Sequence, residues 1–401
     1  MLSVKEAKAV LFGQIGQMPA VSMKVADAQG YILAEDVYSA LDLPSFDHSA
    51  MDGFAVCVEN FQEAEQLIDM PLIGEIRAGG KPVECIEKNT AIGIFTGAPV
   101  PKNANCIVIQ EKAERKGKRL IFHSSELKPH ANIRKRGAQI KAGEKAMSAG
   151  MLLNPAAIGW LSALGITSIR VVARPLVSVL ATGNELKKPG IPLGAGQIYE
   201  SNTFALKAAL NRDNFRTAAV KSVPDQPKKT YDTIKKMLWS SDVVIISGGI
   251  SVGKYDLVKD TLFSLGVEQV FYKVAQKPGK PLFAGKYLHS TSPKWVFALP
   301  GNPAAALVCF YEYVLPVLKK LSGFSDISLR SAMLPLADEF VVKGDRELFL
   351  RAYATNDVVK ILEGQESNMM HSFAASNAIV FLPVSTTPLE KGTLVETHFL
   401  P

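Results

Sequence analysis

Three apolar runs in the second half of the chain each end in a glycine-containing turn, and each is followed by a helical pattern. The runs are PLVSVLATGNEL from Pro175, DVVIISGGISVG from Asp242 and WVFALPGNPAAALVCFYEYVLPVL from Trp295. Buried strands that alternate with helices predict a parallel sheet covered by helices on both faces. In the third run, Asn302 can cap the helix and Pro303 occupies its first position.

The chain of 401 residues is too long for one hydrophobic core, so several domains are expected. It begins with a helical pattern in which Ser3 and Glu6 have the spacing of a capping box. A second helical segment follows Asn154, a plausible N-cap with Pro155 behind it.

The remaining segments differ in their sequence pattern. Residues 43–147 are short strands punctuated by proline and glycine, which is typical of an all-β domain. Residues 174–325 carry the α/β pattern, and residues 326–401 return to short alternating strands. Residues 1–42 and 148–173 flank the first β segment, and the length of the chain by itself predicts two to four domains.

Composition excludes several classes of protein. Hydrophobic residues make up 47% of the chain and charged residues 21%, and no apolar run approaches the roughly 18 residues of a membrane span. The start of the chain lacks the apolar region of a secretory signal, so a cytoplasmic protein without membrane contact is expected. The four cysteines form no C-x-x-C pair and the six histidines show no ligand spacing, so we expect buried thiols and no zinc or iron–sulfur site.

The positive net charge is concentrated in one segment. Residues 111–145 contain 11 Lys or Arg and four Glu, a surplus equal to the net charge of +7 of the whole chain. We consider three interpretations of this charge, in decreasing order of preference: a solvated face, a pocket for a small anion and a nucleic-acid surface. Nucleic acid comes last, because only Phe122 interleaves with these charges.

The three glycine turns predict a ligand site. In an open α/β sheet, ligands bind outside the carboxyl ends of the strands, and the first N–H groups of a helix can hold an anion. The turns TGNEL, SGGISVGKYD and LPGNP all occupy this edge and all carry polar residues. A site for an anionic ligand is therefore expected there.

The stretch SGGISVGKYD nearly matches the P-loop pattern G-x-x-x-x-G-K-[ST]. Tyr255 stands where that pattern requires the hydroxyl that binds magnesium, and no other strand supplies the acidic partner. We interpret the stretch as a phosphate cradle of another kind, in which Asp256 is the nearest candidate for a metal ligand.

A second cluster is the basic turn KVAQKPGKPLFAG. Lys273, Lys277 and Lys280 lie within eight residues, and the proline and glycine residues between the last two stiffen the turn. A solvated turn is the simpler interpretation. An oxyanion or phosphate site is favoured, because a bound anion relieves the repulsion between fixed ammonium groups.

A third cluster is LPSFDHSAMDGFAV, which packs Asp47, Ser49 and Asp52 into a loop that enters a strand. His48 and Met51 carry no motif and are interpreted as structural. The pair Asp52-Gly53 alone would be an ordinary turn.

Taken together, these stretches resemble the molybdopterin molybdenumtransferases, the MoeA family that includes the E-domain of gephyrin. The matching pieces occur in family order and cover essentially the whole chain: LPSFDHSAMDGFAV, IFTGAPVPKNANCIVIQE, NIRKRGAQIKAGE, ATGNEL with GQIYESN, DVVIISGGISVGKYD, QKPGKPLFAG and ALPGNPAAALVCFY. Each piece is weak singly, but seven in order are highly specific.

The resemblance implies a multidomain fold of α/β and β parts. Its centre is a doubly wound parallel α/β domain of the molybdopterin-binding type, residues 174–325. A β-rich inserted domain, residues 43–147, would reach the partner subunit of a homodimer, and a small C-terminal β-domain would cover residues 326–401. Residues 1–42 with 148–173 would form an elongated linking domain.

The family's enzymes insert molybdenum from molybdate into adenylylated molybdopterin and release AMP, which gives the molybdenum cofactor. The resemblance therefore implies a transferase with Mg²⁺ as its cofactor and with active sites between the two subunits. Molybdopterin synthesis proteins and apo-molybdoenzymes are the further partners implied. The alternatives are a molybdopterin adenylyltransferase and a non-catalytic molybdopterin-binding scaffold or carrier.

Site residues follow from the family by position. The residues associated with turnover are Asp52, Thr96, Glu185, Asp225 and Asp256. Of these, Asp225 and Asp256 would bind magnesium. Asp52 and Thr96 would come from the partner subunit. The residues associated with the phosphate cradle are Gly248, Gly249, Ser251 and Gly253. The residues of the molybdate pocket would be Lys277, Lys280, Pro281, Arg351 and Ser372. Substrate contacts would be Lys273 and Arg134, and the turn beside the ligand would be Pro300, Gly301, Asn302 and Pro303.

Two residues depart from the family pattern. Gln139 replaces an acidic residue in NIRKRGAQI, and Asn184 replaces aspartate in TGNEL. Neither is a magnesium ligand in this assignment, so activity is expected to survive, while substrate affinity or metal preference is left open. The choice between molybdate and tungstate is also open, because both are tetrahedral dianions of similar size.

Overall fold

The chain folds into two compact units. The computed structural model describes residues 1–59, 66–250, 257–288, 293–342, 344–385 and 387–401. The large unit consists of Met1–Val21 and Arg170–Pro401, and the inserted unit is Ser22–Ile169. Strands β1 (Ala20–Lys24) and β12 (Ser168–Val172) carry the chain out of the large unit and back, and they pair with each other.

The centre of the large unit is a six-stranded sheet in the order β16-β13-β17-β21-β20-β18. Its strands are β13 (Val177–Thr182), β16 (Thr217–Val223), β17 (Val243–Ser247), β18 (Val267–Tyr272), β20 (Phe283–Tyr287) and β21 (Lys294–Leu299). The pairs β16–β13, β13–β17 and β17–β21 are parallel, as predicted. Strand β20 is antiparallel to both of its neighbours. Residues 273–282, which link β18 to β20, are too few for the crossover that a parallel pair requires.

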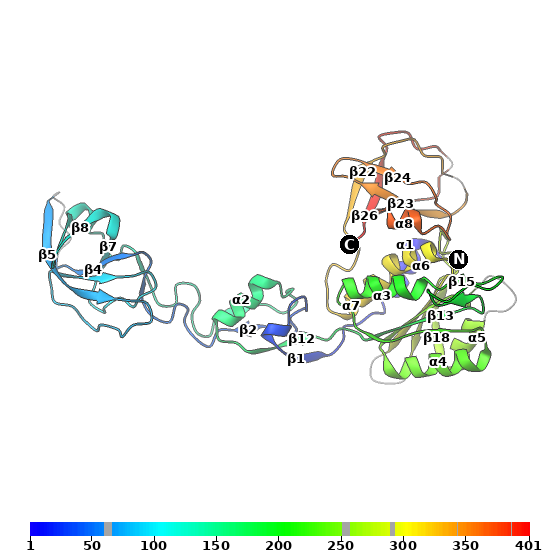
Figure 1. Ribbon diagram of the computed structural model, residues 1–401, viewed down its shortest axis with the longest axis horizontal. Coiled ribbons are helices and arrows are strands. Elements are labelled where there is room, and N and C mark those ends of the chain that lie inside the picture. Colours follow the sequence, from blue (N-terminus) through cyan, green and yellow to red (C-terminus); the bar gives the residue numbers. More distant parts are fainter. Residues whose placement is uncertain (60–65, 251–256, 289–292, 343, 386) are drawn as a thin grey trace. The chain divides into compact units, whose positions relative to one another are not determined.

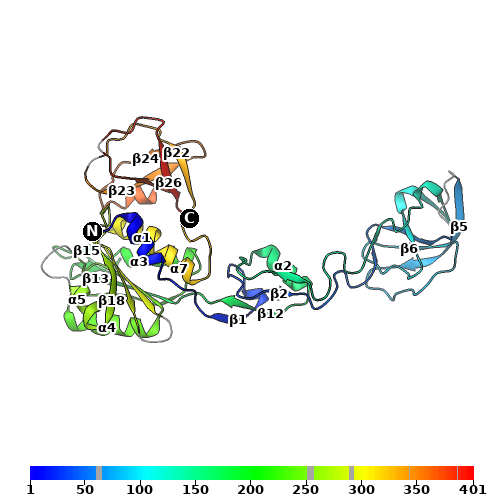
Figure 2. The same cartoon turned by 180° about the vertical axis from the view of Figure 1, so that it is seen from behind.

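Helices cover both faces of this sheet, as the doubly wound prediction requires (Figures 1 and 2). One face carries α3 (Asn202–Arg212), α6 (Pro303–Cys309) and the N-terminal helix α1 (Val4–Phe12); the other carries α4 (Pro227–Ser240) and α5 (Leu257–Ser264). In β17, Val243 and Ile245 join the first core, while Val244 and Ile246 join the second. Every residue of β17 is buried, because both faces of the strand are covered.

The helix starts confirm two of the three predicted caps. In α1, Ser3 Oγ accepts from the N–H of Glu6, and a carboxylate oxygen of Glu6 accepts from the N–H of Ser3, which completes the capping box. The side chain of Asn154 caps α2 (Pro155–Ala163). The expectation that Asn302 caps α6 with its side chain is wrong, because its amide donates instead to Ser367 Oγ at 2.6 Å.

The C-terminal strands form a second six-stranded sheet. They are β22 (Ser331–Pro335), β23 (Glu347–Ala354), β24 (Val359–Ile361), β25 (Ala378–Leu382) and β26 (Leu394–Phe399), and their sixth partner is β19 (Gln276–Lys277). Strand β19 belongs to the link between β18 and β20, and it pairs in parallel with β23. The basic turn is therefore held by the α/β part and the C-terminal sheet together.

The inserted unit contains a third sheet in the order β7-β4-β6-β5-β9-β8. Its strands are β4 (Gly53–Cys57), β5 (Leu67–Ile76), β6 (Thr90–Ile94), β7 (Cys106–Ile109), β8 (Ala113–Lys116) and β9 (Arg119–His123). Two short pairs, β2 (Val37–Tyr38) with β11 (Lys145–Met147) and β3 (His48–Ser49) with β10 (Ile133–Arg134), flank it in sequence. Within residues 43–147, the part of the chain that the structure describes contains only single-turn helices, which agrees with the predicted all-β pattern.

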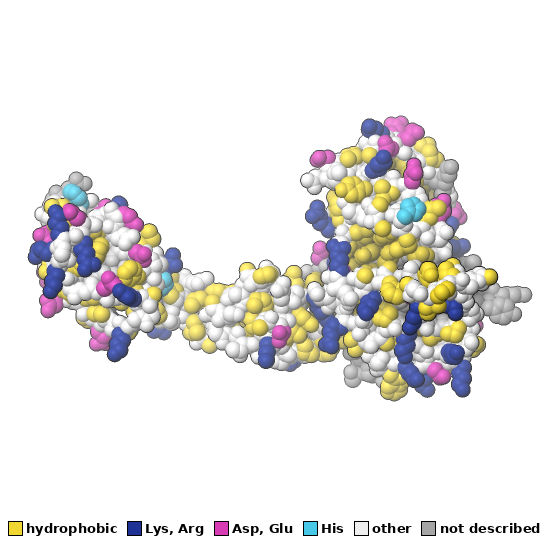
Figure 3. All heavy atoms as spheres, viewed as in Figure 1, with side chains coloured by type: hydrophobic (Ala, Val, Ile, Leu, Met, Phe, Trp, Pro, Cys, Tyr) yellow, Lys and Arg dark blue, Asp and Glu magenta, His cyan; other side chains and the backbone are white. Residues whose placement is uncertain are grey.

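The basic segment of residues 111–145 lies in the inserted unit and is partly neutralised by ion pairs. Six of its 11 Lys and Arg residues pair with carboxylates of the same unit at 2.6–3.2 Å, in the pairs Lys112–Glu126, Lys116–Glu114, Arg119–Asp69, Lys135–Asp47, Arg136–Asp42 and Lys145–Asp36. Figure 3 shows both signs of charge interspersed over the face of this unit that it presents. This arrangement favours the solvated face over an anion pocket or a nucleic-acid surface.

The structure tests the expectations for the cysteines and for membrane-spanning helices. Cys57, Cys106 and Cys309 are buried free thiols, as expected, but Cys85 is exposed. Across the residues described, no helix is both long enough and apolar enough to cross a membrane.

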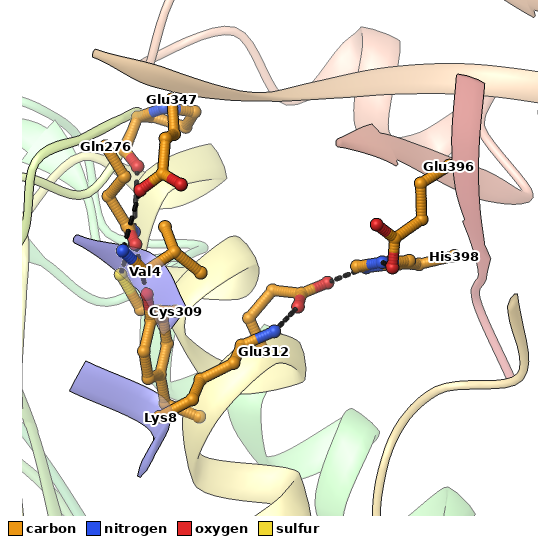
Figure 4. A network of polar contacts seen from close by, with 10 residues as sticks. Val4, Lys8, Gln276, Cys309, Glu312, Glu347, Glu396 and His398 are labelled. Atoms are coloured by element: carbon orange, nitrogen blue, oxygen red, sulfur yellow. Dashed lines mark hydrogen bonds and ion pairs between the residues drawn. The ribbon is translucent and has the colours of Figure 1, made fainter. Parts of the chain in front are cut away.

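A buried ion network joins three distant segments of the large unit (Figure 4). Lys8 Nζ of α1 lies 2.5 Å from Glu312 Oε2, and His398 Nδ1 of β26 lies 2.7 Å from Glu312 Oε1. Glu312 stands on a π-helical turn (Phe310–Val314) between α6 and α7 (Leu315–Leu321). His398 Nε2 also lies 3.0 Å from Glu396. The network fastens the N-terminal helix and the C-terminal sheet to the same helix of the α/β part.

This network predicts a pH-dependent contribution to stability. Burial by itself lowers the pKa of His398, but its hydrogen bonds to Glu312 and Glu396 outweigh burial, so the pKa of His398 is raised above 6.5. The stabilisation from protonated His398 is therefore complete below pH 6.5 and is lost as the pH rises through the raised pKa. We expect His398→Gln to lower the free energy of unfolding by about 2 kcal/mol near pH 6 and by less near pH 9.

Urea unfolding followed by tryptophan fluorescence measures this difference. The control is His123→Gln, because His123 is exposed on β9 of the inserted unit and takes no part in the network. An equal loss for His398→Gln at both pH values would contradict the role of the protonated imidazole.

Candidate functional site

A pocket of about 950 Å³ lies at the carboxyl ends of β13, β17 and β21. This is the edge that the three glycine turns predict. Of the predicted site residues, its wall contains Glu185, Asp225, Gly248, Gly249, Gly301, Asn302 and Pro303. The pair β14 (Leu186–Lys187) and β15 (Ile198–Tyr199), which the sequence analysis did not predict, adds a further side.

Two adjacent glycines form part of the pocket wall where the backbone comes closest to β13. Gly248 has φ +88°, and a Cβ there would lie 2.4 Å from the carbonyl oxygen of Thr182. Gly249 has φ +65°, and a Cβ there would lie 2.5 Å from Thr182 Oγ1. Both positions therefore require glycine. The N–H of Gly248 donates to the carbonyl oxygen of Leu299 at 3.2 Å, whereas the N–H of Gly249 has no hydrogen-bond partner among the described residues. Ser251 and Gly253, the other predicted residues of the cradle, lie outside the described residues.

Asn202 ties two of the predicted turns together, although the sequence analysis assigned it no role. Its amide Nδ2 donates to Ser247 Oγ and to the carbonyl oxygen of Gly301, both at 2.7 Å. Ser247 Oγ in turn donates to the carbonyl oxygen of Pro300 at 3.1 Å. Asn202 is the last residue of the family piece GQIYESN, but its partners lie 45 and 99 residues away, so the pattern alone could not reveal the link.

Asp225 and Glu185 supply carboxylates to the pocket, and Asn184 holds Asp225 in place. The backbone N–H of Asp225 donates to Asn184 Oδ1 at 3.1 Å. A carboxylate at position 184 would offer the same acceptor, so the departure from the family pattern preserves this bond.

The carboxylate of Asp225 fits a cation. Its Oδ1 atom is buried and has no hydrogen-bond partner among the described residues, which is unfavourable for a carboxylate without a counter-ion. No group of three or more His, Cys, Asp or Glu side chains within the described ranges could hold a metal ion. Mg²⁺ commonly uses only one or two carboxylates together with substrate phosphates. The second predicted ligand, Asp256, lies outside the described residues.

The basic turn is closed by backbone hydrogen bonds at its neck. The N–H of Lys273 donates to the carbonyl oxygen of Leu282 at 3.0 Å, and the N–H of Val274 donates to the carbonyl oxygen of Lys280 at 3.1 Å. Lys277 is exposed and Lys280 and Pro281 are half-buried. These bonds fix the spacing of the three lysine backbones.

Gln276 supports the turn from inside the protein (Figure 4). It is fully buried, and its Nε2 donates to the carbonyl oxygen of Pro278 at 3.1 Å, while the buried Tyr313 hydroxyl donates to its Oε1. Gly279 has φ +96°, and a Cβ there would lie 2.6 Å from Gln276 Nε2. Gln276 and Tyr313 were not predicted. Gln276 belongs to the quoted piece QKPGKPLFAG, but its contact with Tyr313 spans 37 residues, and no pattern in the sequence connects the two.

Arg351 and Ser372 are in direct contact, as their shared assignment requires. Arg351 is fully buried; its Nε donates to Ser372 Oγ at 3.2 Å, and its Nη2 donates to the carbonyl oxygens of Gly364 and Glu366 at 2.6 and 3.0 Å. Burial lowers the pKa of Arg351 to about 10, so it remains a cation near neutral pH. Its Nη1 has no hydrogen-bond partner among the described residues.

The basic turn and Arg351 meet on one sheet, outside the wall of the pocket. Lys277 of β19 pairs with Leu348 of β23, the strand that also carries Arg351. Among the described residues of the large unit, the predicted residues outside the pocket wall are Lys273, Lys277, Lys280, Pro281, Pro300, Arg351 and Ser372. The predicted molybdate residues are therefore separate from the wall that the glycine turns form.

The remaining predicted residues lie in the inserted unit. Asp52 Oδ1 accepts from the backbone N–H and from the hydroxyl of Thr96, both at 2.7 Å. The backbone hydrogen bond and then the hydroxyl lower the pKa of Asp52. Arg134 lines a separate hollow of about 410 Å³ with His48 and Gln139, so the second departure from the family pattern lies beside Arg134.

Comparison with known proteins accounts for the whole chain. Residues 2–165 match the MoeA N-terminal region (domain I and II), residues 178–320 a probable molybdopterin binding domain, and residues 333–400 the MoeA C-terminal region (domain IV). A protein of Nostoc named molybdopterin molybdenumtransferase is 34% identical over 100% of this chain and 94% of its own length. The chain belongs to the MoeA family of molybdopterin molybdenumtransferases.

Other relatives also match this MoeA-family chain over nearly its full length. Molybdopterin molybdenumtransferase 2 of Mycobacterium tuberculosis is 32% identical over 99% of both chains. The crystal structure of the molybdopterin biosynthesis MoeA protein from Pyrococcus horikoshii has a TM-score of 0.83 and 29% identity, and it covers 100% of this chain and 99% of that one. The predicted family and fold class are confirmed.

The close approach at Gly249 predicts the cost of a side chain in the MoeA-family pocket. A methyl group at Gly249 would meet both Thr182 Oγ1 and Val258 Cγ2 at 2.5 Å, at a positive φ. We expect Gly249→Ala to lower the free energy of unfolding by about 3 kcal/mol, measured by urea titration.

The matched control is Gly266→Ala. Gly266 has φ +84°, and a methyl group at this position would have nothing within 4 Å, so its substitution should cost only the backbone strain, about 1 kcal/mol. If both variants lost the same free energy of unfolding, the contact with Thr182 would not contribute to the effect of Gly249→Ala.

Proposed function

We propose that this protein inserts molybdenum from molybdate into adenylylated molybdopterin, releasing AMP and forming the molybdenum cofactor. Relatives at 32–34% identity over nearly the full chain carry the name of this transferase. The observation that carries the proposal is the pocket of about 950 Å³ that combines the Gly248–Gly249 backbone with the carboxylate of Asp225. A backbone open to phosphate next to a carboxylate suited to a cation is what a diphosphate substrate requires.

The substrate's diphosphate would lie against the glycine backbone. The turns after β17 and β21 meet through Asn202, so Gly248, Gly249 and Gly301 are held as one surface. This surface is fixed before substrate binds, which lowers the entropic cost of positioning the phosphates.

Magnesium would be held by Asp225 together with Asp256. The unpartnered, buried Oδ1 of Asp225 supports this assignment. When bound, Mg²⁺ neutralises charge on the diphosphate and on the departing AMP. Glu185 is the second carboxylate of the described pocket wall, after Asp225, that we assign to turnover.

Molybdate would be held by the basic turn and Arg351. Lys277 and Lys280 lie on a turn fixed by Gln276, and Arg351 presents an Nη1 donor that no protein group uses within the described residues. A dianion gains charge-assisted hydrogen bonds from such donors. Ser372 orients Arg351, and Lys273, Pro281 and Pro300 would complete this part of the substrate site.

We further propose that the protein acts as a homodimer. Asp52 and Thr96, which are joined by two hydrogen bonds in the inserted unit, would serve the pocket of the partner subunit, together with Arg134. The four-domain division, with residues 43–147 reaching the partner, and a cytoplasmic location remain predictions within this proposal.

The direct test is molybdate-dependent release of AMP from adenylylated molybdopterin by the purified protein. Asp225→Asn should lower the rate about 100-fold, because it removes a proposed metal ligand. The control is Asp326→Asn, since Asp326 is exposed and outside the pocket. Substrate binding without AMP release would favour a scaffold, and formation of adenylylated product from ATP and molybdopterin would favour an adenylyltransferase.

The molybdate site makes a separate prediction. Lys277→Ala should raise KM for molybdate about tenfold, with KM for adenylylated molybdopterin unchanged, because the lysine would contact only the oxyanion. Lys391→Ala, at an exposed lysine of the C-terminal part, is the control. An unchanged KM for molybdate would remove Lys277 from the site.

Mixed dimers test the contribution of the partner subunit. Asp52→Asn and Asp225→Asn should each be nearly inactive alone. After unfolding and refolding of an equal mixture, half of the dimers would be mixed, and each would have one intact site, so about a quarter of the native rate should return. If no activity returns, Asp52 and Asp225 do not combine from two subunits into one site.

A further inference from the structure

A short segment of the C-terminal part, residues 364–368, contacts both the pocket and Arg351. We call it the connecting turn. It follows β23, which carries Arg351, and β24, and its last residue, Asn368, lies in the pocket wall. The sequence analysis gave this segment no role, and none of its residues belongs to the seven family pieces.

One end of the connecting turn holds Arg351. The carbonyl oxygens of Gly364 and Glu366 accept from Arg351 Nη2 at 2.6 and 3.0 Å. The side chain of Gln365 acts as a backbone partner: its Oε1 accepts from the N–H of Arg351 at 3.0 Å, and its Nε2 donates to the carbonyl oxygen of Arg351 at 2.8 Å. Both the guanidinium and the backbone of Arg351 are therefore positioned by this turn.

The other end holds the edge of the pocket. Ser367 Oγ accepts from Asn302 Nδ2 at 2.6 Å, and the carbonyl oxygen of Ser367 accepts from the N–H of Ala304 at 3.1 Å. These bonds explain why Asn302 does not cap α6 with its own side chain. The turn thus fixes Arg351 relative to the start of α6.

Asn368 is the point where the C-terminal part enters the pocket. It is exposed, and its side chain has no hydrogen-bond partner in the described part of the chain, whereas the neighbouring Ser367 is bonded on both sides. Within the described residues after 325, Asn368 alone lines the pocket. Its amide is free to donate to a ligand next to Gly301 and Asn302.

We propose that Asn368 donates a hydrogen bond to a phosphate oxygen of the bound substrate, and that the connecting turn positions Arg351 relative to that substrate. This inference rests on the proposed function and adds Asn368 as a contact residue and Gln365 as a positioning residue. One segment of five residues then sets the distance between the two reactants, which is the quantity that proximity catalysis depends on.

Binding of adenylylated molybdopterin in the absence of molybdate tests the contact. By equilibrium ultrafiltration with the full-length protein, Asn368→Ala should weaken binding about tenfold, the effect of one lost hydrogen bond to a charged group. Asn368→Asp should weaken it further, because a carboxylate cannot donate and repels phosphate, and Asn368→Gln should restore part of the affinity. The matched control is Asn356→Ala, at an exposed asparagine of the same part of the chain outside the pocket.

Steady-state AMP release tests the positioning role. Gln365→Ala should raise KM for molybdate severalfold and leave the affinity for adenylylated molybdopterin unchanged, because it loosens Arg351 but not Asn368. Equal binding by wild type, Asn368→Ala and Asn368→Asp would overturn the contact, and an unchanged KM for molybdate in Gln365→Ala would overturn the positioning role. Because substrate binding is measured without turnover, it remains informative if the wild type releases no AMP, a result that would overturn the proposed function alone.

Discussion

Parallel pairing of β13, β17 and β21 is the constraint on which the site depends. It brings the ends of three strands, at Thr182, Ser247 and Leu299, to one edge of one sheet. Thr182 at the end of β13 then lies so close to Gly248 and Gly249 that no side chain fits between them. The pocket is therefore a consequence of the sheet's connectivity, and the glycines are required by its close packing.

The site has two parts with different means of support. The glycine turns are supported by the α/β sheet and by the amide of Asn202. The basic turn and Arg351 are supported by the C-terminal sheet, through the pairing of β19 with β23, and from within by Gln276. The ion network of Lys8, Glu312 and His398 connects the helices of the first part to the strands of the second.

The sequence was most informative where function requires a local pattern. Glycine turns after apolar strands predicted the pocket edge, and Ser3 with Glu6 predicted the first helix start. The antiparallel β20, the π-helical turn and the β14–β15 pair were missed, because no local pattern reports the direction of a strand, a change of hydrogen bonding within a helix, or a strand of two residues. For the same reason Asn202 and Gln276 were missed, since each acts through residues that no local pattern connects to it.

The comparison of Asn184 and Asn302 shows the limit of inference from residue type. Both are asparagines in predicted turns beside a helix or strand end. Asn184 accepts a hydrogen bond from Asp225 as an aspartate would, whereas Asn302 uses its donor and leaves the helix start uncapped by its side chain. The orientation of the amide, which decides between these roles, is set by the neighbour that each one meets in three dimensions.

The pairing of β19 with the C-terminal sheet determines which parts of the site a shortened chain would keep. A shortened chain that stopped near residue 325 would keep every strand of the α/β sheet and most of the pocket wall. It would lose both Arg351 and the neighbour that holds Lys277 in an extended conformation. Most of the pocket wall is thus independent of the C-terminal sheet, whereas Lys277 and Arg351 come together only where the two sheets share a strand.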